Sequence, residues 1–201
     1  MTKYFHGKSK TGPYFEGWYF KCQTGDGHSL ALIPAVHISA NGERSASLQL
    51  IAEDGAHWLE YPGNAFSAKE DFLDIRLGDC RFSEEGLSVD VDDNDFSLHG
   101  SLRFGPFQRL ESDIMGPFQR LKSMECVHSV FSMRHSLQGQ LELNGRLLDF
   151  GGGTGYIEGD RGSSFPTAYL WTQCTWERGS LMLSVAKSHW ADFVLQGASA
   201  P

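Results

Sequence analysis

The stretch DFSLHGSLRF, residues 95–104, decides the fold class. Its apolar side chains occupy every second position, at Phe96, Leu98, Leu102 and Phe104, and polar side chains lie between them. A period of two puts the apolar side chains on one face of a strand and the polar ones on the other. We therefore predict a half-buried strand in an antiparallel sheet.

The same alternation extends in both directions from this stretch, whereas a helical period of 3.6 hardly occurs. Residues 87–91 alternate directly upstream, and the acidic run 92–95 predicts a solvated hairpin turn. The pair Asn144-Gly145 stands between apolar residues on both sides and predicts a type I′ hairpin. Further strands are predicted at 15–23, 30–38, 45–52, 72–77, 127–133 and 169–173. Short strands at about ten-residue spacing predict an all-β sandwich or up-and-down barrel.

Composition agrees with a globular protein and excludes several classes. Of the 201 residues, 40% are hydrophobic and 21% charged, which excludes a disordered chain. A net charge of -8 argues against nucleic acid as a partner. The basic N-terminus lacks a following apolar run, and Pro34 interrupts the longest apolar stretch, so neither a secretory signal nor a membrane span is expected. We expect a cytoplasmic protein.

The sequence becomes rich in glycine after Phe150. Residues 151–155 read GGGTG, which predicts a linker or domain boundary. We therefore divide the chain into a first β-domain, residues 1–150, and the beginning of a second, residues 151–201.

The four cysteines are widely separated and include no CxxC pair, so we expect reduced, mostly buried thiols.

The first cluster that could carry chemistry is GPYFEGWYFK, residues 12–21. On a strand, Tyr14, Glu16 and Trp18 point to one side. Desolvation among aromatic rings keeps a carboxyl group protonated, and such a group can donate a proton near neutral pH. The alternative is a glutamate paired with Lys or Arg at the start of a strand. Gly17 suggests close approach of backbone or ligand.

The second cluster is GYIEGDRGSSFP, residues 155–166, followed by YLWTQ, residues 169–173. If the strand continues that far, Tyr156, Glu158 and Asp160 share a face, and Arg161 could neutralise either acid. Two carboxyl groups in unequal environments suit an acid–base pair. The same residues also suit a turn with a surface salt bridge. Aromatic residues with one amide, at 169–173, suit a cavity for an amphipathic ring.

Other chemistries find less support. Residues 151–155 lack the Lys-Ser/Thr of a phosphate-binding loop, and no GxSxG is present. Cys126 and His128 share a strand face, but His135 does not, so neither cysteine catalysis nor a metal site is expected. His37 ends an apolar strand and is predicted to be a core histidine. We expect no cofactor and no metal.

Together, the two clusters resemble the tocopherol cyclase family. The resemblance rests on PYFEGWYFK at 13–21 and on Y-x-E-x-D-x-G-x-S-F-P at 156–166, followed by Y-L-W-x-Q. It also includes SxSLQ at 45–49 and SDIMGPF at 112–118. The family is related to carotenoid hydratase proteins and implies two lipocalin-like antiparallel β-barrels. Its reaction protonates a prenyl double bond of a phytyl-quinol, after which a ring hydroxyl closes onto the cation to give a chromanol.

The resemblance also implies site residues. It implies Glu158 or Asp160 as the proton donor, with Glu16 as partner or as binder of the quinol hydroxyls. Trp18 and Trp171 are then cavity walls. The remaining substrate-binding residues that it implies are Tyr14, Tyr156, Phe165 and Gln173. A strong acid in a dry site suits alkene protonation, and aromatic faces suit the tertiary cation that forms.

The sequence departs from the family after Ala186. We find no counterpart of the remaining strands of the second barrel, so the chain is expected to contain one barrel and the start of a second, incomplete one. Unfinished sheets have open edges, which makes self-association through them an expectation. Besides the cyclase-type isomerase, two alternatives stay open: a non-catalytic lipocalin-like carrier of an apolar isoprenoid ligand, and a structural β-domain without a cavity.

Overall fold

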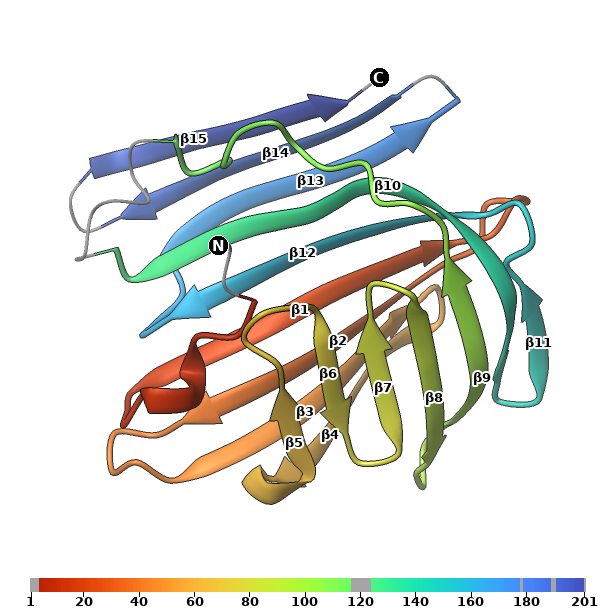
Figure 1. Ribbon diagram of the computed structural model, residues 1–201, viewed down its shortest axis with the longest axis horizontal. Helices are drawn as coiled ribbons and strands as arrows, with labels where there is room; N and C mark the ends of the chain where they lie inside the picture. The colour runs from red at the N-terminus through yellow and green to blue at the C-terminus, as the bar shows by residue number, and fades with distance from the viewer. Residues whose placement is uncertain (1–3, 117–123, 178, 189–190, 201) are drawn as a thin grey trace.

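A computed structural model describes residues 4–116, 124–177, 179–188 and 191–200 of the chain. These residues form an almost entirely β structure with two antiparallel sheets and two short 3-10 helices (Figure 1). The all-β, antiparallel fold class predicted from the sequence is confirmed. Its strands are β1 (Tyr14–Gln23), β2 (Ser29–Ile38), β3 (Arg44–Ala52), β4 (Gly55–Pro62), β5 (Phe66–Ala68), β6 (Asp74–Leu77), β7 (Cys80–Ser83), β8 (Gly86–Asp92), β9 (Ser97–Phe104), β10 (Cys126–Leu143), β11 (Arg146–Asp149), β12 (Thr154–Gly162), β13 (Ala168–Trp176), β14 (Gly179–Ser188) and β15 (Ala191–Ala200).

The larger sheet has the strand order β4-β3-β2-β1-β12-β10-β9-β8-β7-β6-β5, with β11 paired to β10. It folds back on itself, so that β1–β4 and β5–β9 face each other across the main core (Figure 1). The end strands β4 and β5 are joined through the 3-10 helix Gly63–Ala65. Among the described residues no ladder pairs these two strands, so the predicted barrel lacks closure by hydrogen bonds.

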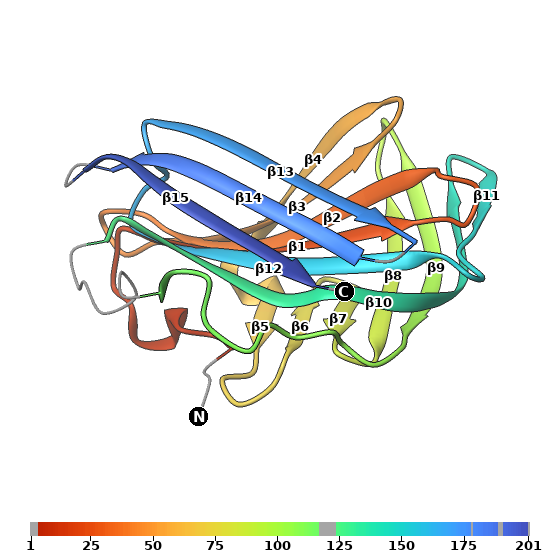
Figure 2. The same cartoon turned by 90° about the horizontal axis from the view of Figure 1, so that it is seen from above.

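The smaller sheet, β13-β14-β15, covers the outer face of the larger one (Figure 2). Aromatic stacking joins the two: the rings of Phe15 and Phe165 are 4.5 Å apart, and Tyr19 meets Trp171 edge to face at 5.5 Å. A second small core, of Met133, Tyr156 and Met182, lies between the sheets. The arrangement leaves both faces of β1 and β12 covered by protein.

Most of the stretch 95–104 forms β9, which begins at Ser97, and the four apolar side chains of the stretch are all buried, as predicted. The Asn144-Gly145 turn is also confirmed, because both residues have positive φ, 52° and 77°. Residues 154–162, which were predicted to follow a linker, differ more from the sequence expectation. They form β12 inside the larger sheet, and the change from one sheet to the other falls between Gly162 and Ala168.

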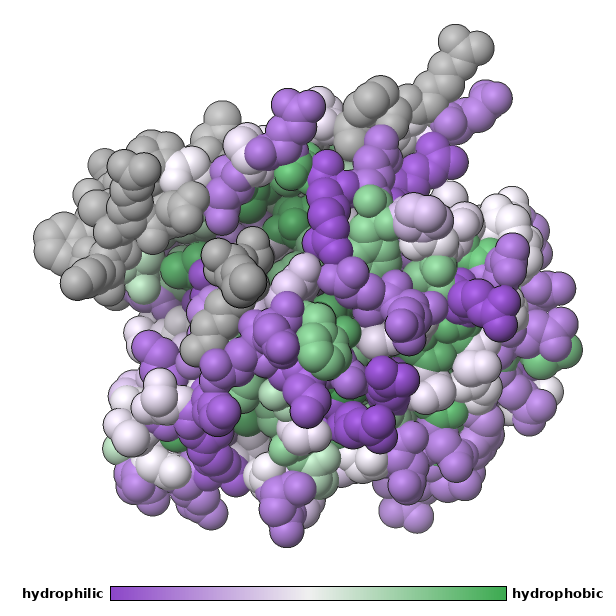
Figure 3. Space-filling view, in the orientation of Figure 1, coloured by the Kyte–Doolittle hydropathy of each residue, from purple (hydrophilic) through white to green (hydrophobic). Residues whose placement is uncertain are grey.

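The C-terminal strand differs from the sequence expectation as well. Residues 191–200, for which no strand was predicted, form β15 and pair with β14. All four cysteines are free, but only Cys22 and Cys80 are buried, rather than most of them. Within the described part of the chain, no helix is long and apolar enough to span a membrane. The face shown in Figure 3 is mainly hydrophilic, with hydrophobic residues in separate small areas.

Candidate active site

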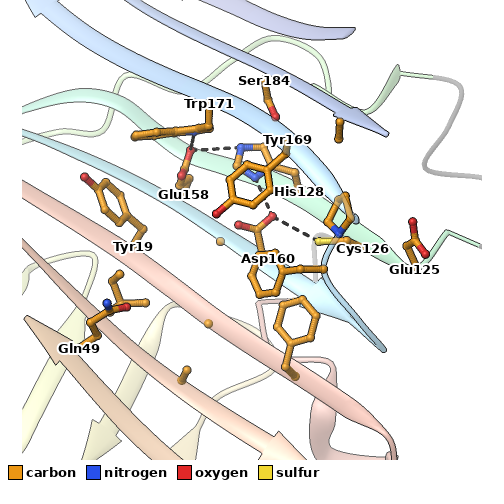
Figure 4. A pocket seen from close by; sticks show the side chains of 18 of the residues that line it. Tyr19, Gln49, Glu125, Cys126, His128, Glu158, Asp160, Tyr169, Trp171 and Ser184 are labelled. Atoms are coloured by element: carbon orange, nitrogen blue, oxygen red, sulfur yellow. Dashed lines mark hydrogen bonds and ion pairs between the residues drawn. The ribbon is translucent and has the colours of Figure 1, made fainter. Parts of the chain in front are cut away.

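A cavity of about 530 Å³ lies between the two sheets. Its floor comes from the outer faces of β1, β2, β3, β10 and β12, and its cover from β13 and β14 (Figure 4). Apolar and aromatic side chains dominate its walls, among them Phe15, Tyr19, Ile33, Phe165 and Trp171. Sites for small organic ligands occupy roughly 300–1,000 Å³ and are mostly apolar with few polar groups, so this cavity has the size and lining of such a site.

Strand register places a histidine and two acids at one end of this cavity. His128 on β10 lies directly opposite Asp160 on β12, and Val130 lies opposite Glu158. Because side chains alternate along β12, Glu158 and Asp160 point to the same face, as the sequence predicts. The His128 ring lies between the two carboxylates (Figure 4), with Nδ1 2.9 Å from Asp160 Oδ1 and Nε2 3.2 Å from Glu158 Oε2.

Glu158 is the more firmly held of the two acids. Tyr156 donates its hydroxyl to Glu158 Oε2 at 2.5 Å, and Trp171 donates Nε1–H to the same oxygen at 3.1 Å. Two hydrogen-bond donors, from β12 and β13, thus converge on one oxygen atom, and His128 on β10 forms an ion pair with the same atom. This arrangement stabilises a carboxylate, and it also ties the smaller sheet to the larger one through Trp171.

The protonation state of His128 follows from its two partners. Burial by itself lowers the pKa of this imidazole, but hydrogen bonds and charges from Asp160 and Glu158 outweigh it and raise the pKa to about 10. His128 is therefore an imidazolium at neutral pH. The ligand atoms of His128, Glu158 and Asp160 lie within 4.8 Å of one another and could hold a metal ion. A metal requires a neutral imidazole, so it competes with the proton that the acids hold there.

Neighbouring groups are kept protonated. Burial raises the pKa of Tyr19 to about 12, with a contribution from the charge of Glu158. Burial, then the charge and hydrogen bond of Glu158, raises the pKa of Tyr156 as well. Burial and the nearby Asp160 raise the pKa of the Cys126 thiol, whose Sγ lies 3.7 Å from Asp160 Oδ1. Cys126 is thus a neutral thiol at the cavity wall, which argues against cysteine nucleophilic chemistry.

The first predicted cluster lies on the opposite face of β1. Tyr14, Glu16 and Trp18 alternate with the cavity residues and point away from the cavity. Trp18 packs in the main core. Glu16 Oε2 accepts hydrogen bonds from the backbone N–H groups of His6 and Gly7 and from the Tyr14 hydroxyl, while Oε1 contacts His6 Nδ1. The structure therefore does not bring Glu16 together with the second cluster.

The other predicted residues lie in or beside the cavity. Phe165 and Trp171 line it, with Phe165 half exposed at its edge. Gln173 lies between the sheets beyond the cavity lining, where its Oε1 accepts a 2.8 Å hydrogen bond from Lys21. Gln173 is therefore a link between the sheets, and burial lowers the pKa of its partner Lys21.

His128 is the member of the candidate site that was not predicted from the sequence. Arg161, expected to neutralise an acid, donates instead to Ser129 Oγ at 3.0 Å. The sequence does show that Cys126 and His128 share a face, and it shows that Glu158 and Asp160 share a face. The missing information is the register between β10 and β12, which sets the two faces against each other.

Comparison with known proteins defines a class of fold and no more. Neither protein-family models nor curated proteins match the sequence. Among solved structures, the architecture belongs with lipocalin-like antiparallel β folds. One match is the crystal structure of kievitone hydratase from Nectria haematococca, with a TM-score of 0.53 and 8% sequence identity. The match covers 97% of this chain and 64% of the hydratase chain, so this chain spans less than two thirds of its length.

Proposed function

We propose that the protein is a tocopherol cyclase-like enzyme, which protonates a prenyl double bond of a phytyl-quinol-type substrate and closes a chromanol ring. The observation that carries the proposal is the group of buried His128, buried Glu158 and partly buried Asp160 at the end of an apolar cavity. Burying the ionisable side chains of His128 and Glu158 costs free energy that binding an apolar ligand does not require. Catalytic sites commonly hold such groups.

Asp160 is the proposed proton donor. Glu158 is held by hydrogen bonds from Tyr156 and Trp171 and is buried, whereas Asp160 is the more accessible of the two acids. Asp160 Oδ1 contacts His128 and Cys126, while its side chain is 30% exposed and lines the cavity. Proton donation by Asp160 leaves a carboxylate beside an imidazolium, which stabilises it.

The ring closure returns the proton. A proton from Asp160 forms a C–H bond with one alkene carbon, and the π electrons leave the other carbon as a tertiary cation. Faces of Tyr19, Trp171 and Phe15 line this cavity and can stabilise the cation. A hydroxyl oxygen of the same substrate forms the C–O bond, and its proton returns to Asp160. Atoms balance as an isomerisation, with no cofactor.

Two further lines support the proposal. The sequence motifs at 13–21 and 156–173 resemble the tocopherol cyclase family. The structural neighbour is by name a hydratase, and hydration, like the proposed closure, adds O–H across a double bond. The chemistry differs in whether water or a hydroxyl of the substrate meets the cation.

Turnover of phytyl-hydroquinone to its chromanol, measured by chromatography, tests the proposal. We expect Asp160→Asn to lower the rate about 10²- to 10⁴-fold, because general acid catalysis contributes that much. Asp90→Asn is the matched control: Asp90 is an exposed carboxylate on β8 that also contacts a histidine, His99. Its rate should equal that of the unmodified chain.

The opposite result is equally definite. If the folded protein converts none of a series of prenyl-quinols, the cyclase proposal fails. Binding of those compounds without turnover, unchanged in Glu158→Gln, would instead establish the apolar carrier.

A further inference from the structure

We infer that the cavity wall formed by His37, Ser47 and Gln49 is a subsite for a neutral oxygen-bearing ring, and that it excludes charged heads such as diphosphates. These residues lie on β2 and β3, across the cavity floor from His128 and Asp160. The inference deepens the proposed function by naming how the polar end of its substrate is held. The subsite itself is argued from the cavity lining. The proposed function is needed only to place the reacting double bond at the Asp160 end of the cavity.

Strand register connects the two ends of the cavity in one row. Starting from His128, the paired positions across the sheet are Asp160, Gly17, Ala35 and Ser47. Three strand spacings separate Asp160 from Ser47, or about 14 Å between backbones. That span accommodates one six-membered ring with a hydrogen-bonded substituent at its far end and a reacting carbon at its near end.

The middle of this row is flat because its residues are small. Gly17 has no side chain and Ala35 has only a methyl group, and both line the cavity. A Cβ atom at Gly17 would lie 3.2 Å from the Ala35 Cβ, so the floor has no room to spare. Phe15 and Tyr19 stand on either side of Gly17 along β1. A planar ring can therefore lie on Gly17 and Ala35 with aromatic side chains at its edges.

The far wall offers hydrogen bonds to a neutral oxygen. His37 Nε2 lies 2.9 Å from Ser47 Oγ, and burial lowers the pKa of His37, which favours a neutral ring. The Gln49 amide lines the cavity (Figure 4) and makes no hydrogen bond to another described residue. An amide both donates and accepts, so Gln49 can bind a hydroxyl or a carbonyl.

The charges of the lining select against an anionic head. Among the described residues, no Lys or Arg lines the cavity, whereas Glu125, Glu158 and Asp160 do. The one cation among the described lining residues, His128, already contacts two acids. A diphosphate or carboxylate entering here would lose its hydration without gaining a positive partner, which is unfavourable. The family resemblance implied Glu16 as a binder of the quinol hydroxyls, but Glu16 lies on the other face of the sheet.

Binding measurements on the full chain test this subsite without turnover. Three probes carry the same geranylgeranyl tail: a hydroquinone, an unsubstituted benzene ring and a diphosphate. Titration is followed by tryptophan fluorescence in the Asp160→Asn background, so that no probe is converted. We expect saturable binding of the first two and none of the diphosphate in the same concentration range.

The decisive variant is Gln49→Leu. Loss of its hydrogen bonds should weaken hydroquinone binding about tenfold relative to the benzene probe. Ser184→Ala, a polar lining residue on the opposite wall, should leave that ratio unchanged. Unchanged affinity for the benzene probe shows that Gln49→Leu is folded.

Two outcomes overturn the inference: a ratio unaffected by Gln49→Leu, or diphosphate binding as tight as hydroquinone binding. Failure of the proposed function looks different, because the unmodified chain would then show the expected preferences and yet form no chromanol.

Discussion

The imidazole of His128 contacts two carboxylates at once, which makes the free energy of unfolding depend on pH in the alkaline range. Its pKa is about 10 in the folded protein and 6.5 ordinarily. A group whose folded pKa is raised stabilises the fold fully below 6.5, and this stabilisation disappears as the pH approaches 10. We expect the urea concentration at the unfolding midpoint to decrease as the pH rises from 6.5 to 10.

His128→Gln should remove most of this alkaline decline. Its exposed counterpart, His28→Gln, should keep it, because His28 lies at the surface beside Glu53. An alkaline decline of equal size in His128→Gln would contradict the assignment of the proton to this residue.

His135 should produce the opposite dependence. It is 3% exposed, its Nδ1 lies 2.9 Å from Ser132 Oγ, and its ring packs against Phe104 and Phe107. Burial lowers the pKa of His135 to about 3. Below pH 6.5 the unfolded chain takes up a proton that the folded chain does not, so stability decreases from 6.5 toward 3.

Thermal unfolding of His135→Gln against the unmodified chain checks this dependence. The variant should be less stable at pH 7, because the packed ring is lost, but its stability should fall less steeply below pH 6.5. Parallel acid profiles for the two proteins would show that His135 does not cause the acid sensitivity.

At the scale of a single element, Glu16 fastens the N-terminal segment to β1. Two backbone N–H groups, of His6 and Gly7, donate to its carboxylate, so Glu16→Gln leaves buried donors poorly satisfied. We expect a loss of about 1–3 kcal/mol in unfolding free energy, the usual cost of an unsatisfied buried group. Limited proteolysis should then cut residues 4–12 faster.

Ligand binding separates this role from the one the resemblance implied. Glu16→Gln should bind prenyl-hydroquinone as the unmodified chain does, because the cavity lies on the other face of β1. Weaker binding with unchanged stability would return Glu16 to the site.

The strands show why some elements could be predicted and others could not. β9 has one apolar and one polar face, so its alternation is visible in the sequence. β4 has no fully buried residue, and β7 has only four residues, so neither produces a pattern. The sequence predicts a strand at 127–133 and a separate hairpin strand before Asn144, whereas β10 runs through both, with register shifts near Ser132 that break the period of two.

Part of the candidate site could be predicted from the sequence for a related reason. Tyr156, Glu158 and Asp160 share a face in any straight strand, and sequence predicts that. β1 is aromatic on both faces, with Trp18 on one and Tyr19 on the other, so alternation alone cannot assign a face to the cavity. His37 was predicted to be a core histidine, but the structure puts it in the cavity lining, since a second sheet covers β2.

At the scale of the whole molecule, the two sheets have different support. β12 and β1 each have neighbours on both sides, whereas β13 and β15 are edge strands of a three-stranded sheet in the described part of the chain. Between the sheets lies a cavity, and a cavity removes contacts that packing would supply. We expect backbone amides of β13 and β14 to exchange with solvent faster than those of β1 and β12.

Prenyl-hydroquinone should slow hydrogen exchange in β13 and β14, because a ligand bound between the two sheets stabilises the arrangement in which they pack together. Hydrogen-exchange mass spectrometry with and without the compound measures this. Geranylgeranyl diphosphate is the comparison and should give no protection. Equal exchange in both sheets, unaffected by any ligand, would contradict the picture.

The pairing of β1 with β12 also bears on how the protein is made. Protein chains leave the ribosome from the N-terminus, so β1–β4 emerge long before residues 154–162. Until then one edge of β1 has unpaired peptide groups, and unpaired edges attract other strands. Pairing so distant in sequence is also slow. In a newly synthesised chain, the edge of β1 therefore stays unpaired until β12 has been made. Chaperones that shield strand edges should raise the yield of folded protein.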